Sequence, residues 1–117
     1  MSLSTNEQSV ASLAGHSLGT NVVHYDERDA ILYALAVGAK ATDLDLVYER
    51  DLRVLPSYGL ALGVWAVEAA AALGVYDSTE TLHASQSLTV HRALPVRGPL
   101  SMTGRIAAVW DKGKAAL

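Results

Sequence analysis

The spacing of apolar and polar positions changes several times along the chain, and each change marks a predicted element. Residues 20–25 are rich in β-branched side chains and predict a strand. Asp26 suits the N-cap of a helix over residues 27–37, because acidic residues fill the first turn and Gly38 stands where a helix C-cap belongs. A charged connector with short extended pieces follows over residues 40–54.

The most apolar stretch of the chain covers residues 57–73, between Pro56 and Gly74. Its alanine content and the proline at its start favour a helix. Glu68 lies near its middle, and a carboxylate is costly at the centre of a bilayer. We therefore expect a helix buried on nearly all sides inside a domain, not a membrane span.

After Asp77 the period becomes that of a strand. Residues 82–94 place Leu88 and Val90 on one face, with polar side chains between them. Turn residues follow, residues 100–111 alternate again, and residues 114–117 begin a further strand after a glycine turn. An apolar helix followed by antiparallel strands is typical of the α+β class.

Composition narrows the possible function classes. The 117 residues suit one domain, which we place at residues 20–117 after a polar and flexible lead-in over residues 1–19. The absence of cysteine excludes disulfides, zinc–thiolate sites and thiol nucleophiles, and fits a cytoplasmic location. The net charge is −3 and the basic residues are scattered, so no nucleic-acid partner is expected. The N-terminus does not have the pattern of a signal peptide.

Gly15-His16-Ser17-Leu18-Gly19 matches the G-x-S-x-G nucleophile elbow of many lipases and esterases. Asp77 and then His83 or His91 follow in the order of a catalytic triad. The elbow needs a buried strand before the serine and a helix after it, whereas this motif lies between a polar lead-in and a β-branched stretch. We interpret the motif as a loop or short strand that enters the domain.

Four acidic residues lie close together in the charged connector. They alternate with apolar residues, which indicates a solvated face, and they lack the glycine and the spacing of an EF-hand loop. We assign no metal site to these residues, which are Asp43, Asp45, Glu49 and Asp51.

Four blocks, in order, resemble the N-terminal domain of MaoC-like dehydratases, and in particular of hydratase 2. The blocks cover residues 25–39, 43–63, 82–95 and 104–115. The family usually has Pro-Thr-Phe at the position of Pro56-Ser57-Tyr58 here. It has His-Gly-Glu-Gln at the position of His83-Ala84-Ser85-Gln86.

The resemblance implies a hot-dog fold, an antiparallel sheet wrapped around a central helix, which we expect to be incomplete at the C-terminus of this chain. It also implies a hydro-lyase built from two hot-dog domains, an (R)-specific enoyl-CoA hydratase or 3-hydroxyacyl-CoA dehydratase. In that family the C-terminal domain carries a catalytic Asp and His in a D-x-N-P-x-H pattern, which this sequence lacks. We therefore assign no catalytic residue here and leave open whether the chain alone is an enzyme.

By the same resemblance, the chain shapes an acyl pocket while Asp and His act from another domain or chain. The implied partners are an acyl-CoA thioester, a catalytic hot-dog domain or chain, and a second copy through hot-dog pairing. No cofactor and no membrane contact are implied. The substrate-binding candidates are Leu55, Pro56, Tyr58, Leu62 and His83.

Other interpretations stay open at this point. Ordinary core packing explains the first four candidates equally well, and His83 suits a role in holding its loop. The chain can also be a stand-alone acyl-CoA-binding or interaction module. A small hot-dog thioesterase that uses an acid between Asp43 and Asp51 is a third hypothesis.

Overall fold

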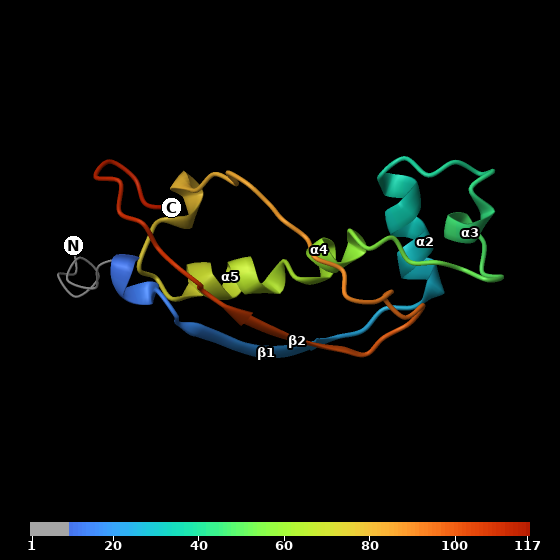
Figure 1. Cartoon of the computed structure of the whole chain (residues 1–117), viewed down its shortest axis with the longest axis horizontal. Coiled ribbons are helices and arrows are strands. Elements are labelled where there is room, and N and C mark those ends of the chain that lie inside the picture. The colour runs from blue at the N-terminus through green and yellow to red at the C-terminus, as the bar shows by residue number, and fades with distance from the viewer. Residues whose placement is uncertain (1–9) are drawn as a thin grey trace. The chain divides into compact units, whose positions relative to one another are not determined.

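The computed structural model describes residues 10–117, which contain two strands with most of the helices between them along the chain (Figure 1). The lead-in predicted to be flexible covers residues 1–19, of which residues 1–9 lie outside the described residues. The domain boundary after residue 19 stays a prediction. None of the helices in the described part of the chain is long and apolar enough to cross a bilayer. The elements are η1 (Val10–Leu13), β1 (Ser17–Val23), α2 (Glu27–Ala36), α3 (Leu44–Val47), α4 (Tyr58–Leu62), α5 (Trp65–Ala72), η2 (Ser78–Glu80) and β2 (Leu100–Arg105).

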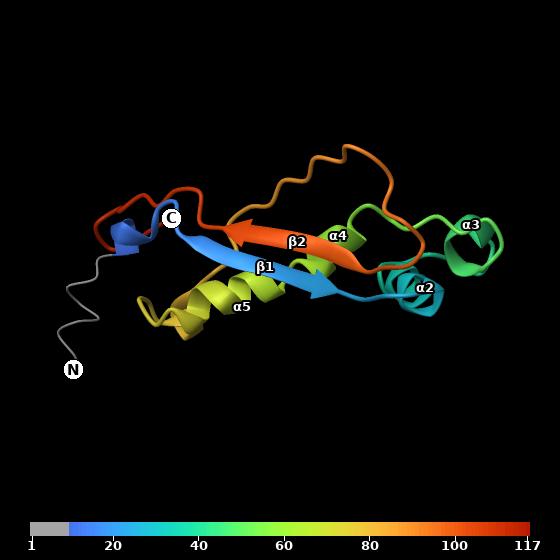
Figure 2. The same cartoon turned by 90° about the horizontal axis from the view of Figure 1, so that it is seen from below.

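The strands β1 and β2 pair into a two-stranded antiparallel sheet (Figure 2). Along β2, half-buried and exposed residues alternate strictly, as the sequence pattern predicts. Two backbone hydrogen bonds extend the pairing beyond the strands, from Gly15 N–H to the Ile106 carbonyl at 2.6 Å and from Ile106 N–H to the His16 carbonyl at 2.9 Å. The predicted α+β class is confirmed at this level, with a small sheet.

The chain divides into two compact units, each assembled from segments that are distant in sequence. The first unit contains the chain up to Asn21 together with Val64–Ser85 and Thr103–Leu117. The second unit contains Val22–Gly63 and Gln86–Met102. Both strands of the sheet therefore have residues in each unit.

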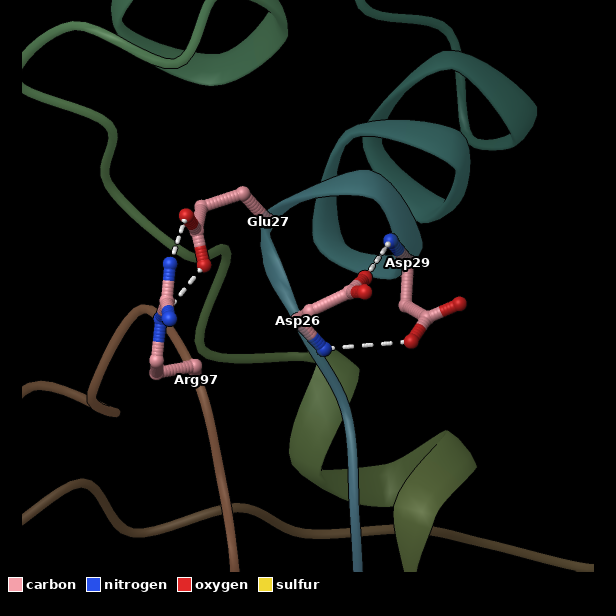
Figure 3. Close-up of polar contacts among 4 residues, drawn as sticks. All are labelled: Asp26, Glu27, Asp29 and Arg97. Atoms are coloured by element: carbon pink, nitrogen blue, oxygen red, sulfur yellow. Dashed lines mark hydrogen bonds and ion pairs between the residues drawn. The ribbon is translucent and has the colours of Figure 1, made fainter.

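Helix α2 begins where the sequence predicts and with the predicted cap. The backbone N–H of Asp29 donates to the Asp26 carboxylate at 3.0 Å, and the backbone N–H of Asp26 donates to the Asp29 carboxylate at 3.1 Å (Figure 3). This reciprocal capping box satisfies two N–H groups that have no partner inside the helix. The bond from the Asp29 N–H also lowers the pKa of Asp26. Gly38 follows the last turn with φ of 112°, a left-handed conformation that suits glycine.

An ion pair at the start of α2 joins this helix to the loop before β2. The Arg97 guanidinium donates to both carboxylate oxygens of Glu27, with Nε at 2.9 Å from Oε1 (Figure 3). The hydrogen bonds from Arg97 lower the pKa of Glu27, and Glu27 in turn raises the pKa of Arg97. Such a two-point contact fixes the orientation of both side chains as well as their distance.

The second unit has a hydrophobic core that draws on both of its segments. Tyr25 is 4% exposed and its ring meets Tyr58 edge-on, with centroids 5.5 Å apart. Two further bonds attach Tyr25 to the other segment: its O–H donates to the Pro95 carbonyl, and its own carbonyl accepts from Gly98 N–H at 2.8 Å. The buried members are Tyr25, Ala30, Leu52 and Val54, and Ile31, Tyr58, Leu62, Leu94 and Leu100 pack against them.

The helix predicted over residues 57–73 forms as two shorter helices, α4 and α5, separated at Gly63 and Val64. Glycine has a low helix propensity, and Gly63 closes the last turn of α4 as its C-cap. The expected burial on nearly all sides is wrong for this chain. Every residue of α5 is at least partly exposed, and Val67 is 68% exposed. A two-stranded sheet is too narrow to surround a helix.

The strand predicted over residues 82–94 is also wrong. These residues belong to a loop outside the helices and strands of the described chain, and Leu88 and Val90 are 46% and 49% exposed. Alternation permits a strand, but a neighbouring strand must complete its hydrogen bonds. The predicted pairing of residues 114–117 does begin: Asp111 bridges to Ala116, and Trp110 and Leu117 exchange two backbone bonds.

We expect opposite effects from alanine at two glycines of the second unit. A Cβ at Gly98 would approach Tyr25 Cδ1 at 3.1 Å, so Gly98→Ala should lower the free energy of unfolding by about 1–3 kcal/mol. A Cβ at Gly59, inside α4, would meet only Leu94 Cδ1 at 3.9 Å, so Gly59→Ala should raise it by about 0.5–1 kcal/mol. Urea unfolding of both variants measures this, and equal effects would contradict the packing described here.

The Glu27–Arg97 pair should make stability depend on pH. Because the folded-state pKa of Glu27 is lowered, its ionised form contributes stability above the ordinary glutamate pKa, and this contribution is lost as the pH falls through the folded-state value. Wild type should therefore exceed Glu27→Gln in unfolding free energy at neutral pH, and the difference should vanish in acid.

Asp45→Asn is the matched control for this measurement. It breaks an ion pair with Arg53 whose side chains are 73% and 50% exposed, so its effect should be small at every pH. Urea unfolding of the three proteins between neutral and acidic pH provides the test. If the difference in unfolding free energy between wild type and Glu27→Gln stayed the same across that pH range, the ionised Glu27–Arg97 pair would not be its source.

Candidate functional site

A surface cavity of about 230 Å³, open to solvent, lies within the second unit, between the start of α4 and the loop before β2. Pro56 and Gly59 form its helical side, and residues 88–92 with Leu94 form the side that comes from the loop. Most of its lining is apolar. Its lining residues are Pro56, Gly59, Leu88, Thr89, Val90, His91, Arg92 and Leu94.

Contacts of Tyr33 stabilise the helical side of the cavity, at the start of α4. Tyr33, on α2, donates its hydroxyl hydrogen to Ser57 Oγ at 2.9 Å, and its ring lies 4.8 Å from that of Tyr58 between centroids. The first turn of α4 closes through bonds from Tyr58 N–H to the Leu55 carbonyl and from Gly59 N–H to the Pro56 carbonyl. Pro56 fits a helix start because its missing N–H would have no partner there.

The loop wall is irregular but attached at its end. Leu94 packs against the hydrophobic core of the unit, and the next residue, Pro95, accepts the hydrogen bond from Tyr25. The Arg97–Glu27 pair lies two residues further on. These contacts fix the C-terminal end of the loop, while Leu88 and Val90 remain half exposed at the cavity.

The polar lining of the cavity is basic. His91 and Arg92 contribute an imidazole and a guanidinium, and none of the eight described residues that line the cavity is a carboxylate. An apolar cavity with a cationic rim suits an amphiphile that has a hydrocarbon part and an anionic part. The same lining lacks an acid–base pair of the kind that proton transfer in both directions requires.

The hydroxyls of Tyr25 and Tyr58 stay protonated at neutral pH, because the pKa of each is raised above its ordinary value. Burial raises the pKa of Tyr58, and the nearby charges of Asp29 and Asp26 raise it further. Burial also raises the pKa of Tyr25, with a smaller contribution from Tyr58. These phenols therefore act as hydrogen-bond donors or packing surfaces, not as bases.

The predicted substrate-binding residues lie in different surroundings. Pro56 lines the cavity, Tyr58 and Leu62 pack against the hydrophobic core, and Leu55 is half buried next to Pro56. His83 belongs to the first unit, where its Nε2 lies 2.8 Å from the Ser85 carbonyl oxygen. Their role in substrate binding stays a prediction.

Sequence reasoning missed most of the cavity lining. The sequence pattern places Leu88 and Val90 in a strand, which the structure does not contain, and gives Gly59 no role. Nothing local to residues 88–94 indicates that they meet Pro56 and Gly59.

The acidic connector is accounted for by local contacts. Asp43 accepts from the Lys40 N–H at 2.7 Å, and Asp45 binds the Arg53 guanidinium at 2.8 Å. Among residues 10–117 no group of three metal-ligating side chains is arranged to hold an ion. Asp43 and Asp45 therefore stabilise their own connector.

The G-x-S-x-G motif forms a strand start. Ser17 is the first residue of β1, and its Oγ accepts from Gly19 N–H at 3.1 Å. Asp77 accepts two hydrogen bonds from Thr79, which lower the pKa of Asp77. A nucleophile elbow would place the serine after a strand and before a helix, so the interpretation of the motif as a short strand is confirmed.

Comparison with known proteins identifies a family for most of the chain. Residues 23–117 match the model of the MFE-2 hydratase 2 N-terminal domain. The match begins near the end of β1 and includes all of the second unit except Val22.

Curated relatives carry hydratase or dehydratase names. The chain is 37% identical over 94 residues to 3-hydroxyacyl-thioester dehydratase Y of Mycobacterium tuberculosis, a match that covers 77% of this chain and 32% of that protein. It is 31% identical over 129 residues to the peroxisomal enoyl-CoA hydratase 2 of Arabidopsis thaliana, covering 100% of this chain and 42% of that protein. A third relative is the peroxisomal multifunctional enzyme type 2 of Mus musculus, 31% identical over 112 residues and matched over 88% of this chain and 15% of that enzyme.

The chain thus spans less than half the length of each of these relatives. The word peroxisomal describes two of the relatives, and the cytoplasmic location of this chain stays a prediction. Because the family model covers far more than half of the sequence, the chain belongs to the family of MFE-2 hydratase 2 N-terminal domains.

Proposed function

We propose that this chain is the non-catalytic half of an (R)-specific enoyl-CoA hydratase or 3-hydroxyacyl-CoA dehydratase. It shapes the acyl pocket, while a catalytic Asp and His act from another domain or chain. The family match and the hydratase and dehydratase names of the relatives support the reaction class. The substrate is then an acyl-CoA thioester.

One observation carries the division of labour: the cavity has one imidazole and no carboxylate among the described residues that line it. Adding water to an enoyl thioester places hydroxide on the β-carbon and a proton on the α-carbon, so it needs a base for the water and an acid for the carbon. It also needs donors aimed at the charge that develops on the thioester oxygen. His91 alone does not meet these requirements, and the sequence lacks D-x-N-P-x-H.

The chain's own residues perform binding in this proposal. The apolar lining at Pro56, Leu88 and Val90 excludes water from the hydrocarbon chain, and burial of that chain provides the affinity. His91 and Arg92 attract the phosphates of the CoA carrier. Tyr33 and Ser57 keep the helical wall in position through their hydrogen bond.

We propose that the complete assembly has the hot-dog fold. Helix α5 is only partly buried: each of its residues is at least partly exposed and Val67 is 68% exposed, which leaves area on the helix for further strands to cover. Gly104 of β2 already approaches this helix: a Cβ there would meet Trp65 and Ala66 at 3.2 Å. Further strands, with residues 86–92 among them, would complete the sheet around the helix, and a second hot-dog domain or copy would pair with it.

The test is the absorbance of the enoyl thioester when the purified chain meets short and long trans-2-enoyl-CoA. We expect no loss of absorbance with the chain alone, and a rise in its unfolding midpoint because ligand bound to the folded state stabilises it. Turnover should appear when a catalytic hot-dog half that carries D-x-N-P-x-H is added.

Three outcomes would contradict this proposal. Turnover by the chain alone that disappears in His91→Gln but persists in the matched His83→Gln variant would place the chemistry in the cavity. Release of free CoA from a saturated acyl-CoA would indicate a thioesterase, with Asp43, Asp45, Glu49 and Asp51 as the residues to replace. Stabilisation without turnover, even with the catalytic half present, would indicate a stand-alone binding module.

A further inference from the structure

Gly59 is the one lining residue of the cavity that lacks a side chain. It lies inside α4, where the backbone is right-handed and any L residue can take its place. A Cβ built at Gly59 would have Leu94 Cδ1, at 3.9 Å, as its nearest neighbour, which is ordinary van der Waals contact. Neither backbone strain nor tight packing therefore explains a glycine here.

Other glycines of the chain differ from Gly59 in this respect. A Cβ at Gly63 would come within 3.3 Å of the Gly59 carbonyl oxygen, and those at Gly98 and Gly104 would approach ring carbons at 3.1 and 3.2 Å. These three allow close packing of their surroundings. At Gly59 a Cβ would fit in ordinary contact with Leu94, and because both residues line the cavity, any atoms beyond that Cβ would take up space in it.

The size of the cavity suits part of an acyl chain. An apolar cavity of about 150 Å³ holds benzene, which corresponds to roughly 25 Å³ per carbon. By the same ratio the cavity of about 230 Å³ has room for about nine carbons. It is smaller than the roughly 300–1,000 Å³ typical of sites for whole drug-sized ligands, so the CoA carrier must lie outside it.

The charge of the lining gives the occupant an orientation. Gly59 and Leu94 are half buried, whereas the other six lining residues, His91 and Arg92 among them, are exposed. An anionic carrier is attracted to the exposed basic side, and the hydrocarbon end then points toward Gly59 and Leu94. A side chain at position 59 would thus occupy the volume that the end of the acyl chain needs.

We propose that Gly59 is a specificity-determining residue that sets how many carbons of an acyl thioester the cavity admits. The inference rests on the proposed function, because it requires an acyl thioester as ligand. It assigns chain-length selection to one position on α4, and each carbon added to that position takes the place of one ligand carbon.

The experiment measures dissociation constants of the full chain for saturated acyl-CoA thioesters, from butanoyl to hexadecanoyl in steps of one carbon, by calorimetric titration. Each methylene that enters the cavity should tighten binding by about four-fold, until the cavity is full and the affinity levels off. In wild type the affinity should level off near nine carbons by the volume ratio above, to within about two carbons.

The variants differ only in what they place at the cavity. Gly59→Ala should move the levelling point by about one carbon and Gly59→Val by about three, both toward shorter chains, at the roughly 25 Å³ per carbon used above. Ala61→Val is the matched control, because Ala61 is exposed on the same helix and does not line the cavity. If Gly59→Val fails to fold, Gly59→Ala still carries the test, since its methyl group has room.

The outcomes separate this inference from the proposed function. A levelling point that shifts in the Gly59 variants and stays in place in Ala61→Val supports both. Binding that levels off at the same length in wild type and Gly59→Val overturns the role of Gly59 and leaves the acyl-binding function standing. Failure of wild type to bind any of the thioesters overturns the proposed function and the inference with it.

Discussion

Tyr25 joins the two chain segments that form the second unit, and the cavity depends on that junction. Its hydroxyl donates to the Pro95 carbonyl, its own carbonyl accepts from Gly98, and its ring meets Tyr58 edge-on. One wall of the cavity begins at Pro56 and the other ends at Leu94, so these contacts hold both walls. The buried ring and its two hydrogen bonds act together, because a buried phenol without a partner would be unfavourable.

Local sequence signals anticipated the elements whose stability is local. Asp26 is the predicted N-cap of α2, where it forms a capping box with Asp29, and Gly38 ends the helix as predicted, because capping depends on residues three or four positions apart. The alternation predicted over residues 100–111 forms a strand only over Leu100–Arg105, where β1 provides the partner strand.

Signals that depend on distant partners were insufficient. Residues 82–94 alternate like a strand, yet Leu88 and Val90 remain in a loop, because a strand also needs a neighbour to complete its hydrogen bonds. The apolar helix was expected to be buried, and α5 stays exposed next to a two-stranded sheet. Of the predicted site residues only Pro56 lines the cavity, since the meeting of residues 56–59 with residues 88–94 is decided by tertiary packing.

The interleaved composition of the two units also determines the order of events during folding. The pairing of β1 with β2 and the bonds of Tyr25 each close a loop of about seventy residues or more, and contacts so distant in sequence form slowly compared with helical turns. On the ribosome, Tyr25 emerges long before Pro95 and Gly98 are synthesised. The apolar stretch that contains α4 and α5 is also synthesised in this interval, before residues 86–102 and 103–117 are available to pack against it. Newly made chains therefore pass through a stage at which this hydrophobic surface is available to chaperones and to other nascent chains.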